Sequence, residues 1–403
     1  MLIIFAPLIR PMDLKKFVDF DQIEIAFKAK SEKALKKRHF IFTTMKWPMM
    51  VSIGTTLTKF GLSVGLPIKG IVKSTIFDIF CGGESLEKCA AAVDELESFG
   101  IGAIFDYSVE GEKSEVGFEE AYQEILETIK VASRSKILRF AAFKLTAVGD
   151  FDLYAKIHAN KELSKAENEA FERVKVRVES ICELASQLEV SLLIDAEETW
   201  IQKPIDDLTI AMMEKYNTTK VVVYYTFQMY CHTMLDHLKA LHGEAEKGAY
   251  ILGAKLVRGA YMEKESARAA EMNYTDPIQP DKASTDRDYN AASLYCIENL
   301  RGISLFAGTH NEDSNYKLTV LMDEFGYKPN NERVFFGQLY GMSDHISFNL
   351  AHGGYNVIKY VPYGPIEATI PYLIRRAAEN TSVKGQSGRE LTLVTNELKR
   401  RRN

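Results

Sequence analysis

Eight short apolar segments, rich in β-branched and aromatic residues, recur along most of this chain, and helical segments separate them. Strands that are apolar on both faces and alternate with helices are typical of α/β proteins with parallel sheets. A series of eight predicts a closed (β/α)8 barrel of the TIM type, with an open doubly wound sheet as the alternative. The predicted strands lie within 102–108, 139–148, 190–198, 220–230, 253–261, 303–311, 333–342 and 355–364.

The sequence before the first strand differs in composition: it contains lysine-rich segments with helical periodicity and an apolar stretch interrupted by glycines. We expect an N-terminal helical extension over 1–98, the barrel over 99–382 and a C-terminal tail over 383–403. Neither a GxGxxG fingerprint nor a Walker lysine is present. A nucleotide cofactor would therefore bind without a Rossmann turn.

Charge, cysteine usage and hydropathy exclude several classes of protein. The net charge of −5 argues against a general nucleic-acid binder. The five cysteines are far apart and form no CxxC pair, so we expect no structural metal or disulfide framework. No run is long and apolar enough to span a bilayer, and the opening MLIIFAPLI lacks the basic start of a secretory signal. Peripheral membrane contact stays possible because it leaves no such pattern.

One helix near the end of the chain carries an unusual polar stripe. In IPYLIRRAAEN, Tyr372, Arg375, Arg376 and Glu379 are spaced at i, i+3, i+4 and i+7, so they share one helix face. Two arginines beside a phenol and a carboxylate favour a site for an anionic ligand. The alternative is a set of surface salt bridges.

Polar residues close most of the predicted strands, at the end of a barrel where active sites are found. Lys144 and the two arginines can hold a carboxylate, and Gln228, Thr309 and Gln338 can donate hydrogen bonds to a heteroaromatic ring. Each residue also has a plain structural explanation, such as a solvated lysine or a helix-capping Asp195. The full set is Lys144, Asp195, Glu197, Glu198, Gln228, Tyr230, Lys255, Arg258, Thr309, His310, Gln338 and Tyr360.

Several motifs, in this order, resemble proline dehydrogenase, the flavoenzyme family that oxidises L-proline to Δ1-pyrroline-5-carboxylate. They are FCGGESLEKC, FDYSVEG, FKLTA, DAEE, GAKLVRGAYMEKE, ARAAEMNYTDPIQP, GTHNE, FGQLYGM, KYVPYGPIE and YLIRRAAEN. The resemblance covers roughly residues 75 to 385 and is closest to the shorter, single-function form of the enzyme. It implies a barrel with FAD over the strand ends and hydride transfer from proline C5 to flavin N5.

The resemblance also assigns roles to residues. Asp195 and Lys255 match catalytic positions, with Asp195 as a charge partner for Lys144 and the arginines. The implied substrate contacts are Lys144, Leu256, Tyr261, Leu339, Tyr360, Tyr372, Arg375, Arg376 and Glu379. The implied FAD contacts are Ala196, Gln228, Lys255, Arg258, Gly259, Ala260, Thr309, His310 and Gln338.

Substrate choice, partners and location follow as expectations. The hydroxyproline-preferring relatives have a small residue where this chain has Tyr360, so proline is expected, with hydroxyproline as the alternative. The resemblance implies a membrane quinone as electron acceptor and a separate pyrroline-5-carboxylate dehydrogenase for the next step, and the negative net charge predicts no nucleic-acid partner. We expect a bacterial cytoplasmic protein, peripheral at the inner membrane, or a mitochondrial one if the source is eukaryotic. A Schiff-base aldolase using Lys144 or Lys255, or a binding protein without flavin, are the alternatives from other classes.

Overall fold

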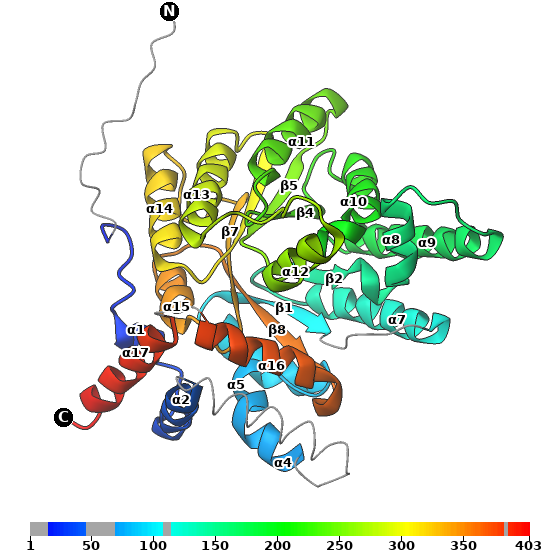
Figure 1. The fold of residues 1–403 in the computed structure, drawn as a ribbon. Helices are drawn as coiled ribbons and strands as arrows, with labels where there is room; N and C mark the ends of the chain where they lie inside the picture. The colour runs from blue at the N-terminus through cyan, green and yellow to red at the C-terminus, as the bar shows by residue number, and fades with distance from the viewer. Residues whose placement is uncertain (1–14, 46–68, 108–113, 383–385) are drawn as a thin grey trace, which may run out of the picture.

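The computed structural model describes residues 15–45, 69–107, 114–382 and 386–403. Within these ranges, eight parallel strands close into a barrel in chain order, and β8 pairs with β1 (Figure 1). The predicted (β/α)8 fold is confirmed. The strands are β1 (Ile101–Tyr107), β2 (Arg139–Lys144), β3 (Ser191–Asp195), β4 (Val223–Gln228), β5 (Leu252–Val257), β6 (Ile303–Gly308), β7 (Val334–Leu339) and β8 (Val357–Tyr363).

Helices surround the barrel (Figure 1), and half of the ten named below begin at a side-chain cap. Ser164 and Glu167 form a reciprocal capping box at α9, and Asp150 and Asn311 cap α8 and α14. The surrounding helices are α6 (Ala90–Glu97), α7 (Glu115–Ala132), α8 (Phe151–His158), α9 (Lys165–Gln187), α10 (Gln202–Tyr216), α11 (Met234–Gly248), α12 (Met262–Met272), α13 (Lys282–Glu298), α14 (Glu312–Glu324) and α15 (Asp344–His352). In the described part of the chain, no helix has the length and apolar character needed to cross a membrane.

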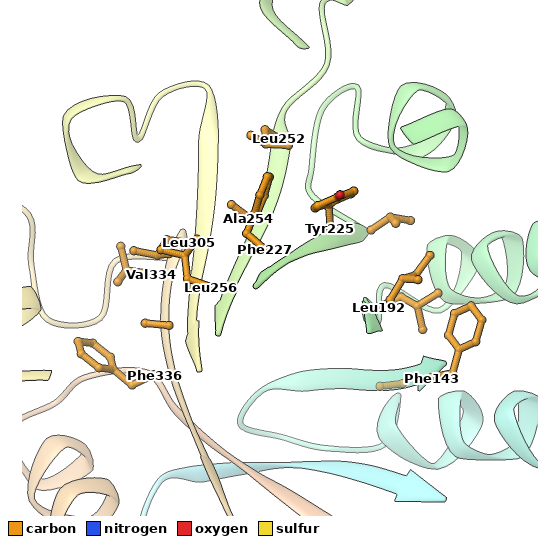
Figure 2. Packing of buried hydrophobic residues seen from close by; sticks show 14 of the residues in the cluster. Phe143, Leu192, Tyr225, Phe227, Leu252, Ala254, Leu256, Leu305, Val334 and Phe336 are labelled. Atoms are coloured by element: carbon orange, nitrogen blue, oxygen red, sulfur yellow. The ribbon is translucent and has the colours of Figure 1, made fainter. Parts of the chain in front are cut away.

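Side chains on the two faces of the strands pack into two separate apolar clusters, because successive side chains of a strand point in opposite directions. The larger cluster lies between the strands and the helices and includes Phe227, Leu256 and Val334 (Figure 2). The smaller cluster fills the barrel itself and includes Phe140 and Phe306. The barrel interior is therefore a packed core along part of its length.

The helices at the two ends of the chain pack together on one side of the barrel. Leu35 and Phe42 of α2 share an apolar cluster with Val394 and Leu398 of α17. The terminal helices are α1 (Ile23–Ala26), α2 (Glu32–Met45), α4 (Lys69–Val72), the π-helix η1 (Lys73–Phe77), α5 (Asp78–Phe80), α16 (Ile366–Ser382) and α17 (Gln386–Arg400).

The prediction of a tail over 383–403 missed α17. Its apolar residues Leu391, Val394 and Leu398 recur at helical spacing, but charged residues around them hide the pattern. The described helices α2 and α17, from the two ends of the chain, therefore pack against each other. The proposed boundaries at 98 and 382 stay predictions.

Candidate active site

Polar side chains replace apolar ones inside the barrel toward the carboxyl ends of the strands. Ala142, Leu193 and Ile358 belong to the inner apolar cluster. Two residues further along the same strands, and therefore on the same inner face, stand Lys144, Asp195 and Tyr360. Apolar side chains therefore fill the barrel below the carboxyl ends of the strands. Charged and phenolic side chains line the opening at those ends, which we call the mouth.

A buried ion pair lies at the centre of this mouth. Lys255 Nζ donates to Asp195 Oδ1 at 2.5 Å, and the ammonium lies 4.7 Å from the centroid of the Tyr360 ring. The Lys255 side chain is 6% exposed, whereas that of Asp195 is 22% exposed. The structure thus brings together three of the predicted site residues and leaves one side of the carboxylate open.

Tyr360 forms a wall of the mouth and has an unsatisfied polar atom. Its ring meets Phe306 edge-on at 6.1 Å, and Leu339 lies beside it on the neighbouring strand. Its buried hydroxyl has no hydrogen-bond partner among the described residues. Burial, together with the negative charges of Asp195 and Asp106, raises the pKa of Tyr360. This neutral phenol can therefore form a hydrogen bond with a ligand bound in the mouth.

Lys144 and Glu197 extend the polar lining. Lys144 is the register partner of Asp195 on adjacent strands. Glu197 is buried and accepts hydrogen bonds from the Thr146 amide, at 3.0 Å, and from the Thr146 hydroxyl. Burial raises the pKa of Glu197 to about 7, and the charge of Lys144 opposes this shift. The charges of Lys144, Glu197 and Asp195 also act on the half-buried phenol of Tyr261.

Arg258 is held rigidly at the rim. Its guanidinium donates to Asp286 at 2.7 Å, Thr309 at 2.5 Å and Ser314 at 2.9 Å, and it stacks 4.5 Å from the Tyr289 ring. The side chain is still 21% exposed. A fixed, partly open guanidinium suits a phosphate ligand, as expected for the predicted contact with FAD.

His310 is fixed in one neutral form by its neighbours. The Leu339 amide donates to His310 Nε2 at 3.3 Å, so the ring proton sits on Nδ1 and is donated to the Ser343 hydroxyl at 2.9 Å. Burial lowers the pKa of His310 to about 3, with further contributions from the charges of Lys359 and Arg376. Both nitrogens are engaged, so a contact with FAD in this arrangement would use the carbon atoms of the ring.

Two predicted site residues point away from the barrel interior. Leu256 belongs to the outer cluster (Figure 2), because its strand neighbour Lys255 faces inward. Gln338 likewise faces α15: its carbonyl accepts from the Ser347 hydroxyl at 2.8 Å, and its amide donates to Thr309 O at 3.2 Å. These are corrections to the predicted direct contacts with substrate and cofactor. In contrast, Gln228 lies on the inner face of β4, four residues after Tyr224 of the inner cluster. Its amide donates to Glu197 O at 2.7 Å.

The predicted Arg-Arg stripe lies on α16, directly after β8. The Arg376 guanidinium is 5.3 Å from the ring centroid of the buried Tyr372. Its charge also reaches His310. The side chains of Arg375 and Glu379 lie outside the described part of the structure, so their contacts with the substrate stay a prediction.

A sequence model of the family described as proline dehydrogenase matches residues 89–389. The chain belongs to the proline dehydrogenase family. It is 33% identical to "Proline dehydrogenase 1, mitochondrial" of Dictyostelium discoideum, over 85% of this chain and 67% of that protein. It is 37% identical to the human protein of the same name, over 67% of this chain and 45% of that protein. The "Carbapenem antibiotics biosynthesis protein CarD" of Pectobacterium carotovorum is 34% identical, over 83% of this chain and 86% of that protein.

Solved structures support the fold assignment. Proline utilization A (PutA) from Bdellovibrio bacteriovorus superposes with a TM-score of 0.69 at 19% identity. The match covers 89% of this chain and 38% of that chain. PutA from Bradyrhizobium japonicum, as its D779Y mutant, gives a TM-score of 0.64 at 18% identity, over 77% of this chain and 31% of that chain. At this identity the likeness concerns the barrel architecture.

Family membership places the chain among oxidoreductases that act on proline, a family in which flavin dependence is general. The residues present fit a flavin. The mouth contains Gln228 and Lys255, whose amide and ammonium groups suit the polar edge of an isoalloxazine. The partly open Arg258 suits a pyrophosphate, and the hydroxyl of Tyr360 lacks a described partner.

Further predicted cofactor contacts lie in loops at the strand ends. Gly259, with φ of 127°, follows β5, and a Cβ there would lie 2.5 Å from the Tyr230 ring. Only glycine therefore suits this turn. Ala260 is exposed beside it, and Ala196 is half-buried next to Asp195.

Two acidic groups at the mouth had no predicted role. Asp106 ends the inner face of β1, and its charge reaches Tyr360. The buried Glu197 was noted only as a strand-end residue. The alternation of the strand from Ile104 to Asp106 could have placed Asp106 on the inner face. Nothing in the sequence indicates that Glu197 is buried.

Proposed function

We propose that this protein oxidises L-proline to Δ1-pyrroline-5-carboxylate with FAD as its cofactor. The proposal is carried by the Lys255–Asp195 pair, which lies beneath the Tyr360 ring at the carboxyl end of a barrel of this family. A cationic group, an open carboxylate and an aromatic wall can together receive a small zwitterion and hold it in one orientation.

The substrate carboxylate would be held by Lys144 together with Arg375 and Arg376. Paired guanidinium groups bind carboxylates through two parallel, charge-assisted hydrogen bonds. The position of Lys144 beside Asp195, and the approach of α16 toward His310 through Arg376, support this arrangement. Glu379 would close the mouth by pairing with one of these cations.

The pyrrolidine ring would pack against Tyr360, Leu339, Tyr372 and Tyr261. Tyr360 and Tyr372 are buried, so their rings offer apolar surface and exclude water. The proline amine must be neutral before oxidation, so we expect the rate to rise with pH through the pKa of the bound amine. The wall of Tyr360 leaves little space beside C4, which favours proline over hydroxyproline.

FAD would be held by Gln228, Lys255 and Arg258, with Thr309 and the loop of Ala196, Gly259 and Ala260 alongside. When bound, it supplies the redox chemistry by accepting a hydride from proline C5 at its N5 atom. Lys255, held in place by its hydrogen bond to Asp195, would stabilise negative charge on the reduced ring. His310 shapes the site as a neutral ring.

The resemblance extends the proposal to the route of the electrons. We propose a membrane quinone as acceptor, a peripheral contact with the membrane, and a separate pyrroline-5-carboxylate dehydrogenase that consumes the product. Reduction of a soluble quinone analogue by proline, together with sedimentation of the protein with vesicles, tests this part. Failure of the proline-reduced protein to reduce the quinone analogue would contradict the proposed electron acceptor.

The decisive experiment is an anaerobic titration of the FAD-loaded protein with L-proline. We expect the flavin absorption to bleach and the cyclic imine product to be trapped by o-aminobenzaldehyde. Flavin that stays oxidised at high proline concentration contradicts the proposal, and faster bleaching by hydroxyproline would favour the alternative substrate. Borohydride trapping of a carbonyl compound on Lys144 or Lys255 would instead reveal aldolase chemistry.

A further inference from the structure

The outer face of β8 contains a fully buried lysine with three oxygen partners. Lys359 precedes Tyr360, and its side chain is 0% exposed. Its ammonium donates to Asp344 Oδ1 at 2.7 Å, to Met342 O at 2.5 Å and to Leu339 O at 3.3 Å. One side chain of β8 thus fixes the start of α15 and both ends of the loop that follows β7.

A cation from the N-terminal helix α2 completes this cluster. Arg38 donates to the second oxygen of Asp344 at 2.7 Å, and both side chains are buried. Although burial opposes ionisation, the charges of Arg38 and Lys359 hold the pKa of Asp344 well below its usual range. Asp344 is therefore a buried anion held between two cations that come from opposite ends of the chain.

The loop that this cluster holds has two residues in the left-handed region. Gly341 has a φ of +78°, and a Cβ there would lie 2.0 Å from Ile79 O. Ser343 has a φ of +50°, and its amide donates to Glu390 of α17. Such a backbone persists only where the surroundings impose it. The terminal helices provide those surroundings.

The same loop reaches the candidate active site at two points. Leu339 begins it and lies beside Tyr360, and the Ser343 hydroxyl accepts from His310. The Leu339 amide in turn donates to His310. A shift of the loop would therefore move an apolar wall and a neutral ring of the site together.

We propose that Arg38, Asp344 and Lys359 are positioning residues that transmit the placement of α2 to the active-site wall formed by Leu339, His310 and Tyr360. The inference rests on the proposed function, because it assigns this wall to proline and flavin. It gives the N-terminal helices a role in substrate binding as well as in stability.

The test compares Arg38→Met with Arg401→Met in the full-length protein. Arg401 of α17 also joins the terminal helices, donating to Lys30 O at 2.6 Å and Phe27 O at 2.8 Å, but its described contacts do not include the loop. We expect Arg38→Met to raise the KM for proline and the Kd for FAD roughly tenfold. It should also speed amide hydrogen exchange in residues 339–343. Arg401→Met should lower the melting temperature without these changes.

Arg38→Lys serves as the second variant if Arg38→Met fails to fold, and we expect it to raise the KM by roughly two- to threefold. A wild-type KM, FAD affinity and exchange rate in either folded Arg38 variant would overturn the proposal, as would equal changes in Arg401→Met. Wild-type protein that fails to oxidise proline would refute the proposed function instead, and the exchange measurement would still test the network.

Discussion

Two buried lysine–aspartate pairs lie on opposite faces of the same barrel wall and differ in how completely their polar atoms are hydrogen-bonded. Lys359 and Asp344, on the outer face, are 0% and 3% exposed, and Arg38 and two carbonyl oxygens complete their coordination. Lys255 and Asp195, on the inner face, lie under an aromatic ring, with the carboxylate 22% exposed.

This difference in hydrogen bonding distinguishes a pair that stabilises the fold from a pair that can take part in the reaction. The outer pair has hydrogen-bond partners on all sides and holds a strained loop. The inner pair is open on one side and adjoins a tyrosine hydroxyl that has no described partner. The inner pair can therefore still bind a ligand, whereas the outer pair has its partners within the protein.

The largest expected effect comes from breaking the outer pair. Lys359→Met leaves Asp344 buried with one cation instead of two and removes the donor for two carbonyls. We expect the free energy of unfolding to fall by about 3–5 kcal/mol, measured by urea denaturation. The matched change on the inner face, Lys255→Met, should cost only about 1–2 kcal/mol, because Asp195 keeps access to water. Equal losses in the two variants would contradict the comparison.

The inner pair should instead control the rate. Lys255→Met removes the cation beside the expected flavin, so we expect the limiting rate of flavin reduction by proline to fall roughly 10²–10³-fold in anaerobic stopped-flow measurements. Lys255→Arg, which keeps the charge, should stay within about tenfold of the wild type. An unchanged rate in Lys255→Met would show that this ammonium takes no part in the reaction.

The carboxyl groups of the two regions should give opposite pH dependences of stability. Burial raises the pKa of Glu197 from 4.5 to about 7, so between these values the folded state holds a proton that the unfolded state has lost. Stability should therefore fall as pH rises through this range, on the order of 2–3 kcal/mol in total. Asp344 has the opposite sign: its pKa is lowered, so its contribution is present above its ordinary pKa and is lost in acid.

Denaturant unfolding of Glu197→Gln at several pH values isolates the first of these effects. The variant should lose the decline between about pH 4.5 and 7 and keep the acid-induced loss. A decline of the same size in wild type and variant would assign it to other groups.

The smallest expected effect concerns substrate choice at Tyr360. Tyr360→Ser opens space beside the substrate ring, so the ratio of kcat/KM for hydroxyproline to that for proline should rise by roughly tenfold. Tyr360→Phe removes the hydroxyl and keeps the ring, so it should leave the ratio near that of the wild type. An unchanged ratio in the serine variant would contradict the explanation that the Tyr360 ring excludes hydroxyproline by its size.

The sequence predicted the inner region better than the outer one, for a physical reason. Strand count and alternation are local patterns, and they placed Lys144, Asp195, Lys255 and Tyr360 at the barrel mouth before the structure was known. The same alternation explains why Leu256 was wrongly predicted to contact the substrate. The motif GAKLVRGAY was assigned to the site as a unit, although neighbouring residues of a strand face opposite sides.

The outer network could not be predicted in this way. Arg38 and Asp344 are 306 positions apart, and no spacing rule connects them. Helix α17 was missed because polar and charged residues outnumber the apolar ones in this segment, although Val394 and Leu398 are buried against α2. Networks that join the two ends of a chain depend on tertiary packing, which local propensity does not contain.

A crystal structure of the FAD-loaded protein with tetrahydrofuran-2-carboxylate, whose ring oxygen replaces the oxidisable amine, tests the central claim most directly. The account predicts the ring between Tyr360 and Leu339, the carboxylate on Lys144 and the arginines of α16, and the flavin beside Lys255. A ligand or flavin bound away from the barrel mouth, with the Lys255–Asp195 pair touching neither, would contradict it.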